Sequence, residues 1–492
     1  MSQIPNYQEK IELSPQEWLC WQDEKFNRWR SVNDFPRVVE FLSDSLPFFN
    51  DWLTEQVNIK HADLIEFGPA RFIKRYGFDV SLVQIDVRYN PFGDVPNDPI
   101  IHTSFLSRHE LEGYEYRKCI RSSSFISYTD WAIKNKIIDY KCVLETLIPN
   151  GSVAYDKTGE TSYSNIQFNI PLHMIGRSVQ YYKENRFNHE THKHPPKLEL
   201  LKLGGFSGEI DGGSFGEKNL EFSDLSNLKL NDVMIPSLQS FYYCKMTNFN
   251  LIKSNLHMAS FYQSVVGIDI REGSIAECNF EYGKVSLSIC DGNLSKSKIK
   301  SSSLSIDLDK ADIIDTKLAY DELVNEPKPE RSRIFHRNAK LLYSRLGYPD
   351  LAGEHYFMEE KSKRQNLWTI FNGTVKNKGL VEIFSSFFKS SGMLLQELYW
   401  GYGEKPLNII KSVAVIIFLF AMFLFLSDNS STHLEFYHSI IFSIQSFTNI
   451  EIVDITQDNL VINLASSVLS FFGLVSIGLL IASLAAKAKN YN

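Results

Sequence analysis

Apolar residues recur every five positions between residues 205 and 320, and this is the most regular pattern in the chain. In an α-helix five residues turn through about 500°, which would scatter these side chains around the helix. A coil of short extended segments instead turns them all toward its interior. The pattern therefore predicts a β-solenoid. Its expected core residues, in runs separated by one-residue slips, are Ile210, Phe215, Leu220, Leu225, Leu230 and Ile235, then Phe241, Met246, Leu251, Leu256, Phe261 and Val266, then Ile270, Ile275, Phe280 and Val285, then Ile289, Leu294, Ile299 and Leu304, then Leu308, Ile313 and Leu318.

A small side chain stands two positions before many of these apolar residues and is often followed by Asp or Asn. This pattern resembles the pentapeptide-repeat family, whose unit is a small residue, Asp or Asn, an apolar residue and two variable positions. The resemblance implies a right-handed quadrilateral β-helix over residues 205–320, with five residues forming one side of a square coil. The small residues are Ser223, Cys244, Ser254, Ala259, Cys278, Ser297, Ala311 and Thr316.

Two long apolar runs, 407–427 and 460–486, follow later in the chain. About 20 residues are needed to cross the hydrocarbon of a bilayer, so each run predicts a transmembrane helix. Lysines flank both runs, whereas the segment that joins them contains no Lys or Arg. By the positive-inside rule, both termini are then expected in the cytoplasm. The lysines are Lys405 just before the first run, Lys411 near its start, and Lys487 and Lys489 just after the second run.

The segment that joins the two runs is too apolar in its middle, at 437–447, for a simple external turn. Non-helical backbone is tolerated at membrane depth only where protein or a water-filled cavity surrounds it. Residues 434–456 are therefore expected to form a short re-entrant helix and a loop. Two helices with such a segment between them are the arrangement of one channel subunit.

The sequence FSIQSFTNIEIVDIT in this segment resembles the pore segment of the two-helix potassium-channel family, with matches at Phe447-Thr448 and at Asp454-Ile455-Thr456. Between these flanks the family has Thr-Val-Gly-Tyr-Gly, whose glycines let successive carbonyls point into the pore. This chain has no glycine there, so the resemblance implies four copies around one pore but a different filter. The implied ion-pathway residues are Thr448, Asn449, Ile450, Glu451, Ile452, Val453 and Asp454.

A ring of Glu451 carboxylates, with Asp454 at the outer mouth, would attract cations by direct charge. The alternative is that Glu451 braces a neighbouring pore helix. Gly473 and Gly478 in the second run are candidates for a gating hinge, and close packing between helices is the favoured alternative. The chain has no Arg-rich span that resembles a voltage sensor, so its cytoplasmic parts are expected to control the opening of the pore.

Helical patterns precede the first apolar run. Residues 329–375 predict a pair of linker helices, and an apolar stripe over 378–400 predicts a helix lying along the membrane surface, or else a soluble helix packed on a neighbour. The stretch GYGEKP at 401–406 resembles the corresponding stretch of bacterial proteins that join pentapeptide repeats to a C-terminal two-helix channel.

Residues 1–200 predict a globular α/β or α+β domain of no recognised family. A helix is expected up to about Val32, and 80–87 and 164–171 have strand character. His189, His192 and His194 have spacing that could suit a metal, but two prolines follow them and no cysteine is near. A solvated linker is the favoured interpretation, and no metal or cofactor is expected.

Composition narrows the class of protein. The 492 residues are too many for a single hydrophobic core, and the net charge of −7 argues against a general nucleic-acid binder. The six cysteines form no CxxC pair and are expected to be reduced thiols. The start MSQIPNYQEKIEL has no apolar region of the kind that a cleavable signal peptide needs.

The sequence therefore predicts a homotetrameric cation channel of a prokaryotic inner membrane, gated when its cytoplasmic domains sense a ligand or protein, with stress or defence as a candidate setting. The alternative is a non-conducting, membrane-tethered pentapeptide-repeat scaffold. DNA mimicry is a weaker hypothesis, because lysines share the coil with the acidic residues. No enzyme is expected, since neither a P-loop nor a GxSxG motif occurs.

Overall fold

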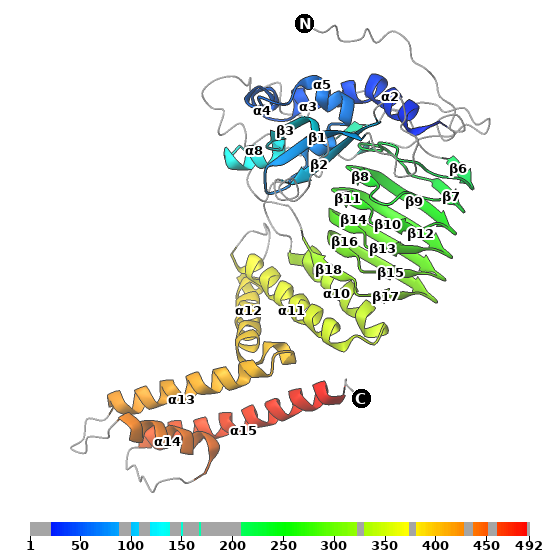
Figure 1. Cartoon of the computed structure of the whole chain (residues 1–492). Helices are drawn as coiled ribbons and strands as arrows, with labels where there is room; N and C mark the ends of the chain where they lie inside the picture. The colour runs from blue at the N-terminus through cyan, green and yellow to red at the C-terminus, as the bar shows by residue number, and fades with distance from the viewer. Residues whose placement is uncertain are drawn as a thin grey trace. The chain divides into compact units, whose positions relative to one another are not determined.

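The computed structural model describes residues 21–87, 100–107, 119–137, 149–150, 167–168, 208–321, 329–372, 380–427, 436–450 and 460–489. The chain forms two compact units, Met1–Pro327 and Lys328–Asn492 (Figure 1). The predictions made for His189, His192, His194 and residues 451–454 lie outside the described residues.

The first unit begins with helices beside a small antiparallel sheet. Strands β1 (Val80–Val87), β2 (Ile100–Ser107) and β3 (Cys119–Phe125) pair in the order β2-β1-β3, and β1 has the bounds that the sequence predicts. Helices beside antiparallel strands favour the α+β class over α/β. A further pair joins β4 (Pro149–Asn150) to β5 (Gln167–Phe168). The helices are α2 (Asp23–Asn33), α3 (Phe35–Ser45), α4 (Phe49–Glu55), α5 (His61–Phe67), α6 (Ala70–Ile73) and α8 (Tyr128–Lys134).

Residues 208–321 form a β-solenoid of about six turns, as the five-residue pattern predicts. Each strand pairs in parallel with the strand one turn further along, so the backbone hydrogen bonds of one turn are satisfied by the next. The strands are β6 (Gly208–Asp211), β7 (Leu228–Asn231), β8 (Ser240–Tyr242), β9 (Lys245–Ile252), β10 (Leu256–His257), β11 (Ser260–Tyr262), β12 (Val265–Arg271), β13 (Ser274–Ala276), β14 (Asn279–Cys290), β15 (Asn293–Ser295), β16 (Lys298–Asp309), β17 (Asp312–Ile314) and β18 (Lys317–Tyr320).

The predicted apolar positions are buried in the coil, except Ile210 and Leu308, which are half-buried. Phe241, Phe261 and Phe280 stack on one another in successive turns, with ring centroids 4.9 and 4.4 Å apart. This ladder is a direct consequence of the repeat, because equivalent positions of adjacent turns lie side by side in parallel strands.

The predicted small residues are buried, except Ala311, which is half-buried. Ser254 Oγ accepts a hydrogen bond from the N–H of Val233, and Ser297 Oγ accepts one from the N–H of Cys278. The serine hydroxyl thus satisfies a backbone donor that would otherwise be buried without a partner.

Three of the four slips, the steps of four residues that follow Val266, Val285 and Leu304, have a structural cause. Equivalent residues are 20 or 21 positions apart in the first turns and 19 apart later. In the regular corners a left-handed residue follows the buried apolar residue by two positions, as Asn248 does with φ of 58°. No left-handed residue occurs at Leu287, so β14 runs straight on and buries Val285, Leu287 and Ile289 alternately. Side chains alternate between the two faces of a strand, so core residues four positions apart, such as Val285 and Ile289, both face the interior of the coil.

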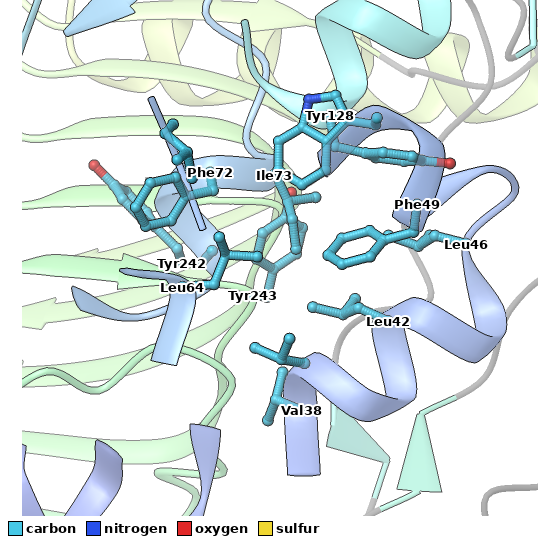
Figure 2. Close-up of a cluster of buried hydrophobic side chains, with 14 of the residues drawn as sticks. Val38, Leu42, Leu46, Phe49, Leu64, Phe72, Ile73, Tyr128, Tyr242 and Tyr243 are labelled. Atoms are coloured by element: carbon cyan, nitrogen blue, oxygen red, sulfur yellow. The ribbon is translucent and has the colours of Figure 1, made fainter. Parts of the chain in front are cut away.

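The N-terminal helices cover the first turns of the solenoid. Phe222 and Tyr243 have left-handed backbone, stack on each other at 4.9 Å, and belong to the hydrophobic cluster of the N-terminal helices. Figure 2 shows Tyr242 and Tyr243 among side chains from the N-terminal helices, such as Leu64 and Ile73. The two parts of the first unit therefore share one core.

The second unit consists of helices in its described parts. Gly347, with φ of 77°, ends the first of them and separates the expected pair. The helices are α10 (Pro329–Arg345), α11 (Pro349–Phe371), α12 (Leu380–Trp400), the short η2 (Gly401–Gly403), α13 (Leu407–Ser427), α14 (Phe436–Thr448) and α15 (Leu460–Lys489). Two segments, Leu407–Leu426 of 20 residues and Leu460–Ala485 of 26 residues, are long and apolar enough to cross a membrane.

Candidate functional site

The residues predicted to form an ion pathway lie between α13 and α15, and the structure describes α14 and the two residues after it. Helix α14 has 13 residues. It is therefore about 20 Å long, which is too short to cross a hydrocarbon core of about 30 Å. It packs against both neighbours, and a buried cluster joins Leu424 of α13, Phe442 of α14 and Ile462 of α15.

Small polar residues line the side of α14 that is buried. Ser439, Ser443 and Ser446 follow one another at helical spacing and are each less than a tenth exposed. Ser446 Oγ accepts a hydrogen bond from Ser466 Oγ of α15 at 2.8 Å. Serine is short, so it allows two helices to approach closely in an apolar environment, and here the hydroxyls of Ser443 and Ser446 are hydrogen-bonded.

The C-terminal end of α14 carries the first three predicted pathway residues. The Thr448 hydroxyl donates to the carbonyl of Ile444 at 2.8 Å, within the last turn of the helix. Asn449 has φ of 53°, the left-handed conformation that commonly ends a helix and that asparagine tolerates. Ile450 follows and is exposed. Glu451, Ile452, Val453 and Asp454, the other predicted pathway residues, lie outside the described residues.

The two glycines proposed as hinges differ in their surroundings. A Cβ at Gly473 would lie 1.8 Å from the carbonyl oxygen of Phe447, whereas a Cβ at Gly478 would meet nothing within 4 Å. Helix α15 is continuous through both. The absence of a side chain at Gly473 thus lets α15 touch the backbone of α14.

Helix α12 has its small polar residues inside and its large apolar residues outside. Ser386 and Ser390 are buried, and Ser390 Oγ donates toward the carbonyl of Arg364 on α11 at 3.4 Å. On the other side, large apolar side chains are 60 to 84% exposed within the chain. This is the reverse of a helix in a water-soluble protein. The exposed residues are Val381, Phe384, Phe388, Leu395 and Leu398.

Helices α10 and α11 enclose a pair of buried histidines. His336 and His355 lie with their Nδ1 atoms 2.9 Å apart, and the ring of Tyr343 stacks on His355. Burial, together with the neighbouring His355, lowers the pKa of His336 to about 4, and burial lowers the pKa of His355 to about 4. Both imidazoles are therefore neutral near pH 7, and one can donate to the other.

Acidification is expected to loosen this helix pair. In the unfolded chain both imidazoles take up protons below their ordinary pKa of 6.5, whereas in the folded pair they stay neutral down to about pH 4. The free energy of unfolding that the two imidazoles contribute is fully present above pH 6.5. As the pH is lowered from 6.5 to about 4, it decreases by about 1.4 kcal/mol per pH unit for each imidazole. Hydrogen exchange of α10 and α11 amides at pH 7 and pH 5 measures this loss. The double variant His336→Leu, His355→Leu should lose the pH dependence, and a wild-type protein with pH-independent opening would contradict the prediction.

A buried charged cluster joins the N-terminal helices to the first turn of the solenoid, and nothing in the sequence pattern indicated it. Arg30 Nη1 donates to Asp34 at 2.7 Å, and its Nη2 donates to the backbone carbonyl of Glu221. The Glu221 side chain accepts from the N–H of Ala70 at 3.1 Å and lies 3.3 Å from Arg71 Nε. Burial raises the pKa of Glu221 to about 7, although both arginines and the Ala70 N–H oppose the rise.

Among the described residues, no group of three or more His, Cys, Asp or Glu side chains is arranged to hold a metal ion. The GYGEKP stretch at 401–406 has a structural role that sequence analysis did not assign, since it forms the connection between α12 and α13. No protein-family model matches the chain, and no curated protein matches it in sequence.

Proposed function

We propose that the protein is one subunit of a cation channel in a prokaryotic inner membrane, with segment 448–454 as its ion pathway. The observation that carries this proposal is helix α14, which is short, apolar and packed between two helices long enough to cross a membrane. A helix that ends at membrane depth is tolerated only where protein or water surrounds the free end of its backbone. Four copies around a shared axis would provide both.

The remaining features of the proposal follow from the sequence. Helices α13 and α15 span the bilayer with both termini in the cytoplasm, and the exposed apolar side of α12 lies against membrane lipid. Residues 208–321 form the right-handed, four-sided coil of a pentapeptide-repeat protein. The N-terminal domain senses a ligand or protein, and the solenoid either transmits that signal to the membrane helices or serves as a spacer between the two. The outward apolar side of α12 supports the membrane location, because lipid is the environment that suits it.

Ion flux from liposomes that contain the full-length protein tests the proposal. Replacing Glu451 with Gln would remove the proposed ring of charge, and we expect the preference for cations over anions to fall about tenfold. Asp428→Asn is the matched control, since Asp428 lies outside segment 448–454. The two variants should differ in selectivity while both insert into the membrane.

Two outcomes would count against this role. Unchanged selectivity in Glu451→Gln would remove the proposed contribution of that carboxylate and favour its alternative role as a brace. A membrane-inserted tetramer that passes no ions under any condition would contradict the channel and support the non-conducting scaffold.

A further inference from the structure

The connection between α12 and α13 is folded by three consecutive residues with left-handed backbone. Gly401, Tyr402 and Gly403 have φ angles of 60°, 56° and 92°. Glycine adopts this region readily, but a side chain makes it unfavourable, so Tyr402 needs compensating contacts. Its side chain is buried, and burial together with the Glu397 carboxylate raises its pKa to about 12. The hydroxyl therefore stays protonated and donates toward Glu397 Oε2 at 3.4 Å.

Helix α11 supplies the contacts that hold this connection. The ring of Phe357 lies against that of Tyr402, with centroids 5.8 Å apart, and Lys405 Nζ lies 3.8 Å from the centroid of the Phe357 ring. Arg364 Nε donates to Glu397 Oε2 at 2.8 Å, and both side chains are less than a fifth exposed. The connection is thus tied to α11 by ring contacts, and the ion pair ties the last turn of α12 to the same helix.

A glycine of α11 completes the contact. A Cβ at Gly353 would lie 2.2 Å from Glu404 Oε2, so the carboxylate occupies space that any other residue would fill. Gly353, Phe357 and Arg364 are four and seven residues apart, which places all three on one side of the helix. One face of α11 therefore contacts Glu397 in the last turn of α12 and three residues of the connection, Tyr402, Glu404 and Lys405.

We propose that this face of α11 is a coupling surface through which the α10–α11 helix pair sets the position of α13. A helix moves as a rigid body, so any displacement of α11 acts on Tyr402, Glu404 and Lys405 together. The connection is short, because α13 begins at Leu407, so it cannot extend to absorb such a displacement. Coupling to ion flux rests on the proposed function, whereas coupling to the first turn of α13 does not.

Charge reversal at the ion pair tests the proposal. In Arg364→Glu we expect steady-state flux to change about fivefold or more, the range typical of coupling between sites. The amides of Asn408 and Ile409, which donate to Lys405 and Pro406, should exchange faster. Adding Glu397→Arg should restore both quantities toward wild type. Glu354→Ala, at an exposed position of the same helix, should leave both unchanged.

A second variant guards against loss of folding. Gly353→Ala displaces only the end of the flexible Glu404 side chain and suits a helix better than glycine, so it should alter flux and exchange in a folded protein. A conducting wild type with unaltered flux and exchange in Arg364→Glu and Gly353→Ala would overturn the coupling. A wild type without flux would contradict the proposed function instead, and exchange at Asn408 and Ile409 would then decide the coupling alone.

Discussion

Replacing Arg30 with alanine is expected to lower the opening free energy of the N-terminal helices by about 3–5 kcal/mol, the usual cost of leaving one partner of a buried ion pair alone. The Arg30 side chain is fully buried and bonds Asp34 and the backbone carbonyl of Glu221. Its guanidinium also lies 4.8 Å from the centroid of the Phe35 ring. Truncation would leave a buried carboxylate and a buried carbonyl poorly satisfied at the point where the helices meet the solenoid.

Native-state hydrogen exchange on the full-length protein measures this loss, because it reports each region separately. Amides of α2, α3 and the first turn of the solenoid should lose protection together, whereas the last turns should change little. Arg28→Ala is the control, since Arg28 is exposed on the same helix and should change stability by less than about 0.5 kcal/mol. Equal protection in the two variants would show that the buried cluster does not hold the two parts together.

Replacing Gly473 with alanine is expected to reduce cation flux about tenfold or more and to lower the melting temperature in detergent. The added methyl group would lie 1.8 Å from the carbonyl oxygen of Phe447, which is backbone and cannot rotate away. Overpacking of this kind costs about 1–3 kcal/mol, and relief requires the end of α14 to move away from α15. Thr448 and Asn449 would move with it.

Gly478→Ala is the matched control, because its methyl group meets no atom of the chain within 4 Å. It should keep its flux and its melting temperature. If Gly478→Ala abolished gating while Gly473→Ala behaved like wild type, the packing role would be wrong and a hinge in α15 would be supported. The melting temperature tests the contact between Gly473 and the Phe447 backbone even if the protein does not conduct ions.

The solenoid is the part of the fold that sequence analysis predicted best. Its register is periodic and local, so Phe261 and Phe280 were identified as core residues and do stack in the core. The slips were visible but unexplained, because the sequence does not show that the strand at Leu287 continues through a missing corner. Backbone conformation there depends on the neighbouring turn, which the pattern does not describe.

The candidate site was predicted only in part. The two helices long enough to cross a membrane were expected, since long apolar runs are strong signals. The point at which α14 ends, at Thr448, was not predicted. The contacts of Gly353 with Glu404 and of Arg364 with Glu397 were not predicted either, because they join residues more than 30 positions apart in ordinary helical sequence.

The sequence by itself determined the inward-facing residues of the coil and the two helices that can cross a membrane, since both depend on the spacing and length of apolar runs. Only the tertiary structure decided that Glu221 and Arg30 are buried together, that Gly473 touches the backbone of Phe447, and that α11 holds the connection to α13. Each of these depends on which surfaces meet. The sequence around a single polar residue or glycine is the same whether that residue contacts a neighbouring element or faces water.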